Sequence, residues 1–310
     1  MKTDIEQLEE IRKVAYGKQQ KYVRIALPFV FLAVALVIYT VILVVLDDTN
    51  PIGLLPLLFA ALCIIVSIVI NNIGYADKRS FKASFKSKIV QALLNDTYEK
   101  VLYKPESSIN ESEITESKLA RKPDRFVGED FVSGIYQNIR FRSSEVILKQ
   151  RRTSSTKYGT TTTYVPYFTG RWYIFEFRKS FKEQLRVIEN DFSNWGFAPS
   201  GFHKIETESI GFNNEFRIES TNQEFAFYII TPQMIESLKI IERNFKGSIS
   251  FLWKKNQLHV AINDGKNAFE PKFNKPLNDE NLKDIKRDID IPKMIIDKLN
   301  LNHIKYSNEA

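Results

Sequence analysis

Long apolar runs come first along the chain, and alternating patterns come later. Residues 25–46 and 52–72 carry no charged side chain, and the sequence DDTNP fills the gap between them. At helical rise the first run is about 33 Å long, which matches a hydrocarbon core of about 30 Å. The pattern therefore predicts two transmembrane helices joined by a short turn, a hairpin over residues 25–74.

A buried core hairpin and a cleaved signal peptide fit these two runs less well. A buried hairpin would need more apolar cover than a soluble domain of this size offers. A signal peptide does not fit, because the first run starts late and a second follows at once. Neither run holds a charge. Since transport pathways usually expose ionisable groups inside the membrane, we expect an anchor rather than a channel or transporter.

Basic residues beside the runs predict their orientation. Cytoplasmic flanks of membrane spans are enriched in Lys and Arg. The gap between the two runs contains neither, whereas both outer flanks are basic: Arg12, Lys13, Lys18, Lys21 and Arg24 before, and Lys78, Arg79, Lys82, Lys86 and Lys88 after. We therefore expect a two-pass protein with both termini in the cytoplasm.

Helical periodicity marks the segments on either side of the hairpin. Residues 1–24 are predicted to form a cytoplasmic helix that continues into the first span. Residues 76–103 are predicted to form an amphipathic stalk helix, with Phe81, Phe85 and Ile89 on its apolar face. The neighbouring row of Lys78, Lys82 and Lys86 is a candidate for contact with anionic lipid headgroups. An ordinary amphipathic helix with a solvated face is the simpler account of the same row.

The chain then becomes polar before a strand-like region begins. Residues 104–123 are bounded by prolines and are predicted to be a polar linker with one short helix capped by Asn110 or Ser112. Alternating patterns from Phe126 onward predict antiparallel strands, and helical segments follow them. We therefore expect residues 124–310 to form a cytoplasmic mixed α+β domain with an antiparallel sheet. The whole chain is of the α+β class, with an N-terminal transmembrane hairpin.

Residues 151–164, RRTSSTKYGTTTTY, form a polar stretch between two predicted strands. A mobile hairpin loop is the expected structure. The cations Arg151, Arg152 and Lys157 among hydroxyl groups are candidates for contact with phosphate, in a lipid headgroup or in RNA. Nucleic acid is not the expected partner, because a net charge of +7 spread over 310 residues lacks the concentrated basic face of such proteins.

The stretch SIGFNNEFRIES, residues 209–220, is predicted to be core with solvated edges. Phe212, Phe216 and Ile218 fit the inward face of a strand, and the glutamates fit its outer edge. A helix is predicted after it, because Thr231 suits the N-cap position and Pro232 the first helical position. Apolar side chains such as Met234 then recur at helical spacing.

The order of several landmarks resembles a known family. These landmarks are Glu208-Ser209, Phe212-Asn213, Phe216, Thr231-Pro232 and Met234. Residues 124–271, with the double span before them, resemble the domain of unknown function 3137 (DUF3137), a bacterial family of membrane-anchored proteins. The sequence departs from the family pattern at Thr207 and Gln223. The resemblance implies a bacterial cytoplasmic (inner) membrane location and a LemA-type membrane protein as a partner, and it carries no established activity.

Candidate chemistry is sparse. The histidines are His203, His259 and His303, none in a metal-protease motif, and the single cysteine, Cys63, excludes a disulfide within the chain. His259 alternates within LHVAI and is expected on the polar side of a strand. The sharpest acid–base candidate is Glu208 with His203. We expect no metal and no cofactor.

Two functions follow from these observations. The first is a non-enzymatic, membrane-anchored binding or scaffold module that contacts the lipid bilayer and a membrane protein. The alternative is a membrane-associated hydrolase or transferase with carboxylate chemistry near Glu208. The absence of a recognisable catalytic motif favours the binding module.

Overall fold

The computed structural model describes residues 2–45, 55–157, 159–190 and 198–307. The chain divides into two compact units. The helical unit contains residues 1–90 and 270–284, and the sheet unit contains residues 91–269 and 285–310. The turn expected at residues 47–51 lies outside the described residues.

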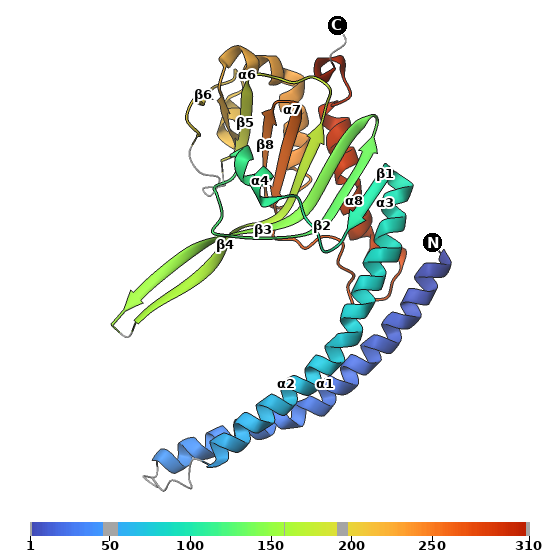
Figure 1. The fold of residues 1–310 in the computed structure, drawn as a ribbon, viewed down its shortest axis with the longest axis vertical. Helices are drawn as coiled ribbons and strands as arrows, with labels where there is room; N and C mark the ends of the chain where they lie inside the picture. The colour runs from blue at the N-terminus through green and yellow to red at the C-terminus, as the bar shows by residue number, and fades with distance from the viewer. Residues whose placement is uncertain (1, 46–54, 158, 191–197, 308–310) are drawn as a thin grey trace. The chain divides into compact units, whose positions relative to one another are not determined.

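Two long helices lie side by side in the helical unit (Figure 1). Helix α1 (Lys2–Val45) is continuous, so the segment predicted as an N-terminal helix runs directly into the first apolar run. Helix α2 (Leu55–Phe85) continues the second run and passes into a π-helical turn, Lys86–Val90. Both helices are long and apolar enough to cross a membrane.

Small residues form the seam between α1 and α2. At seven-residue intervals the buried positions are Ala26, Ala33 and Thr40 on α1, and Ala60, Ser67 and Gly74 on α2. Spacing of seven keeps one side of a helix facing its partner, and small side chains let two helix backbones approach closely, as in membrane helix pairs. The large apolar side chains therefore point outward.

Gly74 lies at a close approach of α2 to α1. A Cβ atom added to it would lie 3.1 Å from the Cβ of Tyr22 on α1. We therefore expect Gly74→Leu to overpack the seam and weaken helix pairing by about 1–3 kcal/mol. An SDS titration of the full-length protein in mild detergent, followed by circular dichroism, measures this. Ile73→Leu is the control, since Ile73 is 51% exposed, and equal titration midpoints for both variants would contradict the packing.

Residues 270–284 attach to the two helices by specific polar contacts. Arg12 of α1 donates from Nη1 to the backbone carbonyl of Phe273 at 2.9 Å. The Glu9 carboxylate accepts from the backbone N–H of Leu277 at 2.8 Å. On α2, Lys82 pairs with Glu270, and Lys86 pairs with the same carboxylate at 3.1 Å.

A single nine-stranded antiparallel sheet organises the other unit (Figure 1). Its order is β1-β2-β3-β4-β9-β8-β5-β7-β6. The strands are β1 (Glu99–Lys104), β2 (Arg125–Tyr136), β3 (Ile139–Thr156), β4 (Gly159–Glu176), β5 (Gln184–Glu189), β6 (His203–Ile205), β7 (Phe216–Ser220), β8 (Ser248–Lys254) and β9 (Gln257–Asn263). The helices are α3 (Gln91–Thr97), α4 (Glu111–Ser117), α5 (Ile210–Glu215), α6 (Gln223–Ile229), α7 (Pro232–Glu242) and α8 (Asp279–Leu299), followed by a 3₁₀ turn, Ile304–Tyr306.

Both faces of the central strands are covered. The α4 face carries Trp172 and Leu252, which pack in one core cluster with Ile114 of α4. The α8 face carries Phe141, whose ring lies 4.6 Å from that of Tyr98. The Tyr98 hydroxyl donates to the Ile289 carbonyl of α8 at 2.5 Å. Because both faces are covered, β8 and β9 are buried at nearly every position.

The predicted polar linker, residues 104–123, is part of this core, and the linker prediction was wrong. Ile109, Ile114 and Leu119 are almost fully buried in the core cluster. The short helix was correctly expected, since α4 follows Asn110. The few apolar residues of the segment 104–123 are spaced among polar ones, so the sequence pattern did not indicate that they are buried. The stalk prediction over residues 76–103 also ran too far, because the helix ends at Thr97 and residues 99–104 form edge strand β1.

The β3–β4 hairpin extends beyond the rest of the sheet (Figure 1). Its register continues without a break from Lys149↔Pro166 to Thr156↔Gly159. The pairing of β2 with β3 begins at Lys149, so residues 150–156 and 159–165 form a two-stranded ribbon in the described part of the chain. The expectation of a mobile loop over residues 151–164 is therefore corrected to paired strands at residues 151–156 and 159–164.

Candidate functional site

An open groove of about 650 Å³ lies beside the SIGFNNEFRIES stretch. Its apolar floor comes from α6, α7 and the junction between them, and consists of Phe227, Ile230, Pro232 and Ile235. Glu206, Glu208 and Glu236 stand on its rim, and all three are exposed. The groove is therefore apolar inside and acidic around its edge.

Local hydrogen bonds hold the rim segment in place. The Asn213 side chain on α5 accepts from the backbone N–H and the hydroxyl of Thr207, at 3.0 and 2.8 Å. Its amide group donates to the Thr207 carbonyl at 2.7 Å. Ser209 caps α5 by accepting from the Phe212 N–H. These bonds attach the loop that carries Glu206 and Glu208 to the start of α5.

The residues of the family pattern have different places in the structure. Glu208 and Pro232 line it. Phe212 and Phe216 lie beneath the surface with exposures of 0% and 1%, and their ring centroids are 4.9 Å apart. Thr231 caps α7 by accepting from the N–H of Met234, whose side chain is buried. The stretch expected to be one strand is a short helix, α5, followed by strand β7.

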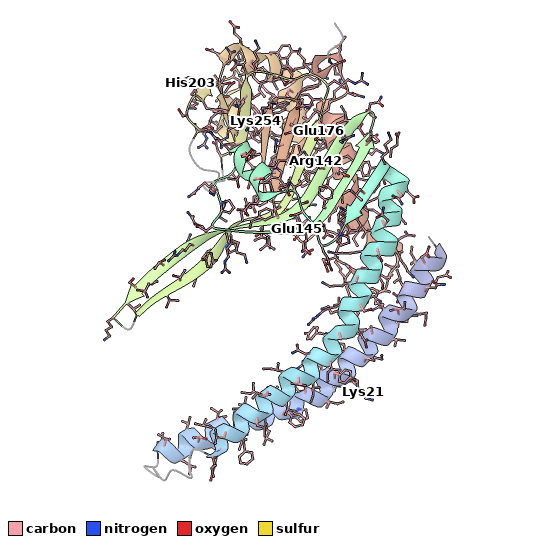
Figure 2. All side chains as sticks on the ribbon, viewed as in Figure 1. Lys21, Arg142, Glu145, Glu176, His203 and Lys254 are labelled. Carbon is pink, nitrogen blue, oxygen red and sulfur yellow. The ribbon has the colours of Figure 1, made fainter. Side chains whose placement is uncertain are left out.

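The acid–base candidate pair is not held in one site. His203 lies on the edge strand β6, opposite Ser220, and is exposed. It is not among the residues lining the groove that contains Glu208. Figure 2 shows His203 at one margin of the sheet unit. His303 has a local role, because its ring nitrogen Nδ1 accepts from the Lys305 N–H at 3.1 Å.

Glu219 is not the solvated edge that the sequence predicted. It is 4% exposed on β7 and pairs with the fully buried Arg186 of β5 at 2.8 Å. Arg217 also approaches it, at 2.9 Å. Arg186 donates in addition to the Leu119 carbonyl at 3.3 Å. Burial lowers the pKa of the Arg186 guanidinium, and the Glu219 carboxylate opposes this effect.

A second ionic network lies on the α4 face. Arg142 donates to both carboxylate oxygens of Glu113 on α4, at 2.8 and 2.6 Å, and also to Glu176 at 3.1 Å. Lys254 donates to the Glu116 carbonyl at 2.6 Å. Figure 2 shows Arg142, Glu176 and Lys254 in the same part of the sheet unit. These contacts dock α4, so the cations there have structural partners.

His259 is buried on this face, which corrects its predicted position on a polar side. It is 2% exposed, and its Nδ1 accepts from the indole N–H of Trp172 at 3.2 Å. Its Nε2 lies 3.3 Å from the side-chain oxygen of Gln257, which indicates the Nε2–H tautomer. Burial, with Lys254 and Arg142 nearby, lowers the pKa of His259 to about 3.

The His259 environment predicts a loss of stability in acid. Its folded pKa of about 3 lies below the ordinary histidine pKa of 6.5, so the unfolded chain binds more protons between these pH values. Unfolding free energy should fall by about 2 kcal/mol between about pH 7.5 and pH 5 from this group. Urea unfolding of the full-length protein in mild detergent measures this.

Matched variants isolate the histidine. His259→Asn keeps an acceptor for the Trp172 indole N–H and removes the titration, so its stability should vary less with pH. His203→Asn, at an exposed position, should keep the wild-type pH dependence. If His259→Asn retained the full dependence, another buried group would be responsible.

Three carboxylates cluster at a bulge in β2. Ligand oxygens of Glu129, Asp130 and Glu145 lie within 4.8 Å of one another, a donor set of the kind hard cations prefer. Each also has a protein donor. Asp130 accepts from the Tyr103 hydroxyl at 2.6 Å, Glu145 from the Ala268 N–H at 2.7 Å, and Glu129 from an Asn267 amide at 3.3 Å. These bonds tie neighbouring segments together, and we assign no ligand to the cluster.

The cations proposed for lipid contact fall into two groups. Lys86 is 6% exposed and pairs with Glu270, as Lys82 does, so both help to attach residues 270–284. Lys78 lies over the rings of Tyr75 and Phe273, at 5.5 and 5.6 Å. The side chains of Arg151 and Arg152 on the ribbon, and of Lys157 next to it, are exposed.

Only some of the residues that line the groove were predicted from the sequence. It singled out Glu208 and Pro232 but not Phe227 or Ile230, because EFAFYII fitted a strand or a helix. The sequence signal for these residues is the high density of apolar side chains in EFAFYII. A helix this short cannot bury all of its apolar side chains, so some of them must be exposed.

Comparison with known proteins supports a family and no activity. Residues 166–301 match the family described as "Protein of unknown function (DUF3137)". No curated protein matches the chain. Among solved structures, the mycobacterial trehalose monomycolate transport factor A, TtfA, is similar at 10% identity and a TM-score of 0.37, over 66% of this chain and 93% of that one. Similarity this weak carries no functional argument. Residues 166–301 are therefore assigned to the DUF3137 family, and the rest of the chain lies outside the match.

Proposed function

We propose that the protein is a membrane-anchored binding module, in which α1 and α2 form the anchor and the sheet unit binds a partner. The observation that supports the anchor most directly is the exposure of apolar side chains along both helices. Only 11% and 17% of their most apolar stretches is buried. A core helix of a soluble protein would be mostly covered, whereas lipid tails solvate such a surface.

The proposed topology is that of a two-pass protein of the bacterial inner membrane with both termini in the cytoplasm. Basic residues flank the two apolar runs on their outer sides only. Single-cysteine labelling tests it, since Cys63→Ser removes the only cysteine. In intact cells, a membrane-impermeant maleimide should label Thr49→Cys. It should label Gln19→Cys and Ser154→Cys only after lysis, and labelling of all three before lysis would refute the topology.

Binding rather than catalysis is supported by the roles of the ionisable side chains. His259 and Arg186 are buried in structural contacts, and His203 lies outside the groove that holds Glu208. The alternative function, a hydrolase or transferase with carboxylate chemistry at Glu208, is tested by one substitution. Glu208→Gln should leave folding unchanged. Loss of a measured hydrolytic or transfer activity in that folded variant would favour the enzyme.

Anionic lipid contact is proposed as a secondary property. Arg151 and Arg152 of the ribbon and Lys157 beside it have exposed side chains, and Lys78 is half-buried, whereas Lys82 and Lys86 pair with Glu270. Lysine and arginine near an anionic leaflet each contribute about 1 kcal/mol to binding. A LemA-type membrane protein is the proposed protein partner.

Affinity purification from native membranes in mild detergent tests the binding module. We expect a stoichiometric protein to copurify with the full-length chain and to be lost when groove residues are changed. Purification with lipid alone would contradict a protein partner. It would shift the proposal to headgroup recognition by the exposed cations.

A further inference from the structure

We propose that the groove between residues 206–209 and the α6–α7 junction binds a basic amphipathic segment of a partner protein. This inference rests on the proposed function as a binding module and specifies the chemistry of the partner. Two features of the groove, its floor and its rim, define that chemistry independently.

The floor requires apolar side chains in the occupant. Ile230 and Ile235 form its buried base with exposures of 5% and 8%. Phe227 remains 44% exposed, and Pro232 is also exposed. Ile210, next in sequence to Ser209 of the rim, is 75% exposed. Single exposed apolar residues are ordinary, but a group of them around one hollow marks an interaction surface.

The rim requires positive charge. Glu206, Glu208 and Glu236 are exposed, and within the described part of the chain no basic residue lines the groove. Lys204 pairs with Glu206 at 2.8 Å, which leaves the carboxylates in excess. In a chain of net charge +7, this acidic rim stands out against the overall charge. Complementary charges steer a partner and fix its orientation.

Together these features fit the way a helix lies in a groove. In that mode, apolar side chains at helical spacing fill the floor, and the charged flank of the helix meets the rim. Lysine and arginine suit the flanks, because their alkyl stems cover apolar surface while their cations reach carboxylates. The occupant is therefore an amphipathic helix with leucine-like anchors and basic flanks.

A lipid surface and a second copy of the chain fit the groove less well. An anionic lipid surface would be repelled by three carboxylates. A second copy could offer the basic residues Arg151 and Arg152, but they stand in the polar sequence RRTSST, which supplies no apolar side chain for the floor. A partner protein with both features is the best match.

A designed peptide tests this chemistry on the full-length protein in nanodiscs of zwitterionic lipid. The probe is a fluorescein-labelled leucine–lysine helix of about 14 residues, roughly four turns. Its twin has glutamate in place of lysine. Fluorescence anisotropy, corrected with empty nanodiscs, gives the affinity. The lysine peptide should bind with saturation and weaken as salt rises, and the glutamate twin should not bind.

Variants locate the binding site. Glu208→Gln/Glu236→Gln and Phe227→Ala should each weaken lysine-peptide binding by about tenfold, since the first removes rim charge and the second removes an apolar anchor. The control Glu106→Gln/Glu111→Gln removes the same charge at exposed positions outside the groove and should bind as the wild type does. Urea unfolding midpoints of all variants should stay near wild type.

Each contrary outcome overturns the assignment. Equal affinity in wild type and groove variants would place the peptide elsewhere. Binding of the glutamate twin would remove the charge argument. Self-association that the groove variants abolish would assign the groove to a second copy. Failure of these tests leaves membrane anchoring intact, because cysteine labelling measures the anchor separately.

Discussion

Replacing Glu219 by alanine is expected to destabilise the sheet unit by about 3–5 kcal/mol. The change leaves the Arg186 guanidinium, which is 0% exposed, without the carboxylate 2.8 Å away. A charge taken out of water needs a partner of opposite charge, and the Leu119 carbonyl oxygen, which accepts from Arg186, carries only a partial charge. Urea unfolding in mild detergent, followed by the fluorescence of buried Trp172 and Trp253, measures the loss.

Two companion variants separate a lost charge partner from lost packing. Arg186→Met/Glu219→Leu removes both charges and should recover much of the stability, because apolar side chains can replace a buried pair. Glu215→Ala is the surface control. Its carboxylate is 47% exposed and lies 3.5 Å from Lys239, so the cost should be below about 1 kcal/mol. A double variant as unstable as Glu219→Ala would show that packing, not charge, dominates.

Replacing Phe216 by alanine is expected to cost about 3–5 kcal/mol as well, for a different reason. Its ring is 1% exposed and lies 4.9 Å from that of Phe212. Truncation removes buried apolar surface and leaves a cavity that the paired strands around β7 cannot fill without moving. The same unfolding measurement applies.

Phe227→Ala is the matched control for this variant. It removes the same ring from a position that is 44% exposed, so its cost should be below about 1 kcal/mol. Near-native stability of Phe216→Ala would contradict its place in the core. Together the two variants distinguish a phenylalanine that holds the fold from one that is available to a partner.

Local signals were enough for much of the fold. The two apolar runs predicted α1 and α2, and the Thr231-Pro232 pair predicted the start of α7. The hairpin of β8 and β9 turns between Lys254 and Gln257, where the pattern placed it. These features depend on residues a few positions apart, so caps, periodicity and turn chemistry are visible in the sequence itself.

The candidate site was only partly visible for the same reason. Glu208 and Pro232 stood out in the sequence, but a groove exists only when α6, α7 and residues 206–209 are placed against one another. How these segments pack against one another depends on the length of α6 and on which side of the helix carries its apolar side chains. EFAFYII fitted two secondary structures, so its sequence did not specify either.

The errors about residues 104–123, His259 and Glu219 have one physical cause. The segment taken as a linker packs on the α4 face, where Arg186 contacts its Leu119 carbonyl, and His259 and the Arg186–Glu219 pair are buried by residues distant in sequence. The hydrogen bond from Arg186 to the Leu119 carbonyl joins residues 67 positions apart in the sequence. The bond from Trp172 to His259 joins residues 87 positions apart.

The sequence by itself determined the apolar helices, the α+β class and the strands with strong local patterns. Tertiary structure alone decided which polar residues are buried and which apolar residues stay exposed at a groove. The physical reason is that periodicity is a property of neighbouring residues, whereas burial depends on what covers a side chain. Here that cover comes from parts of the chain far away in sequence.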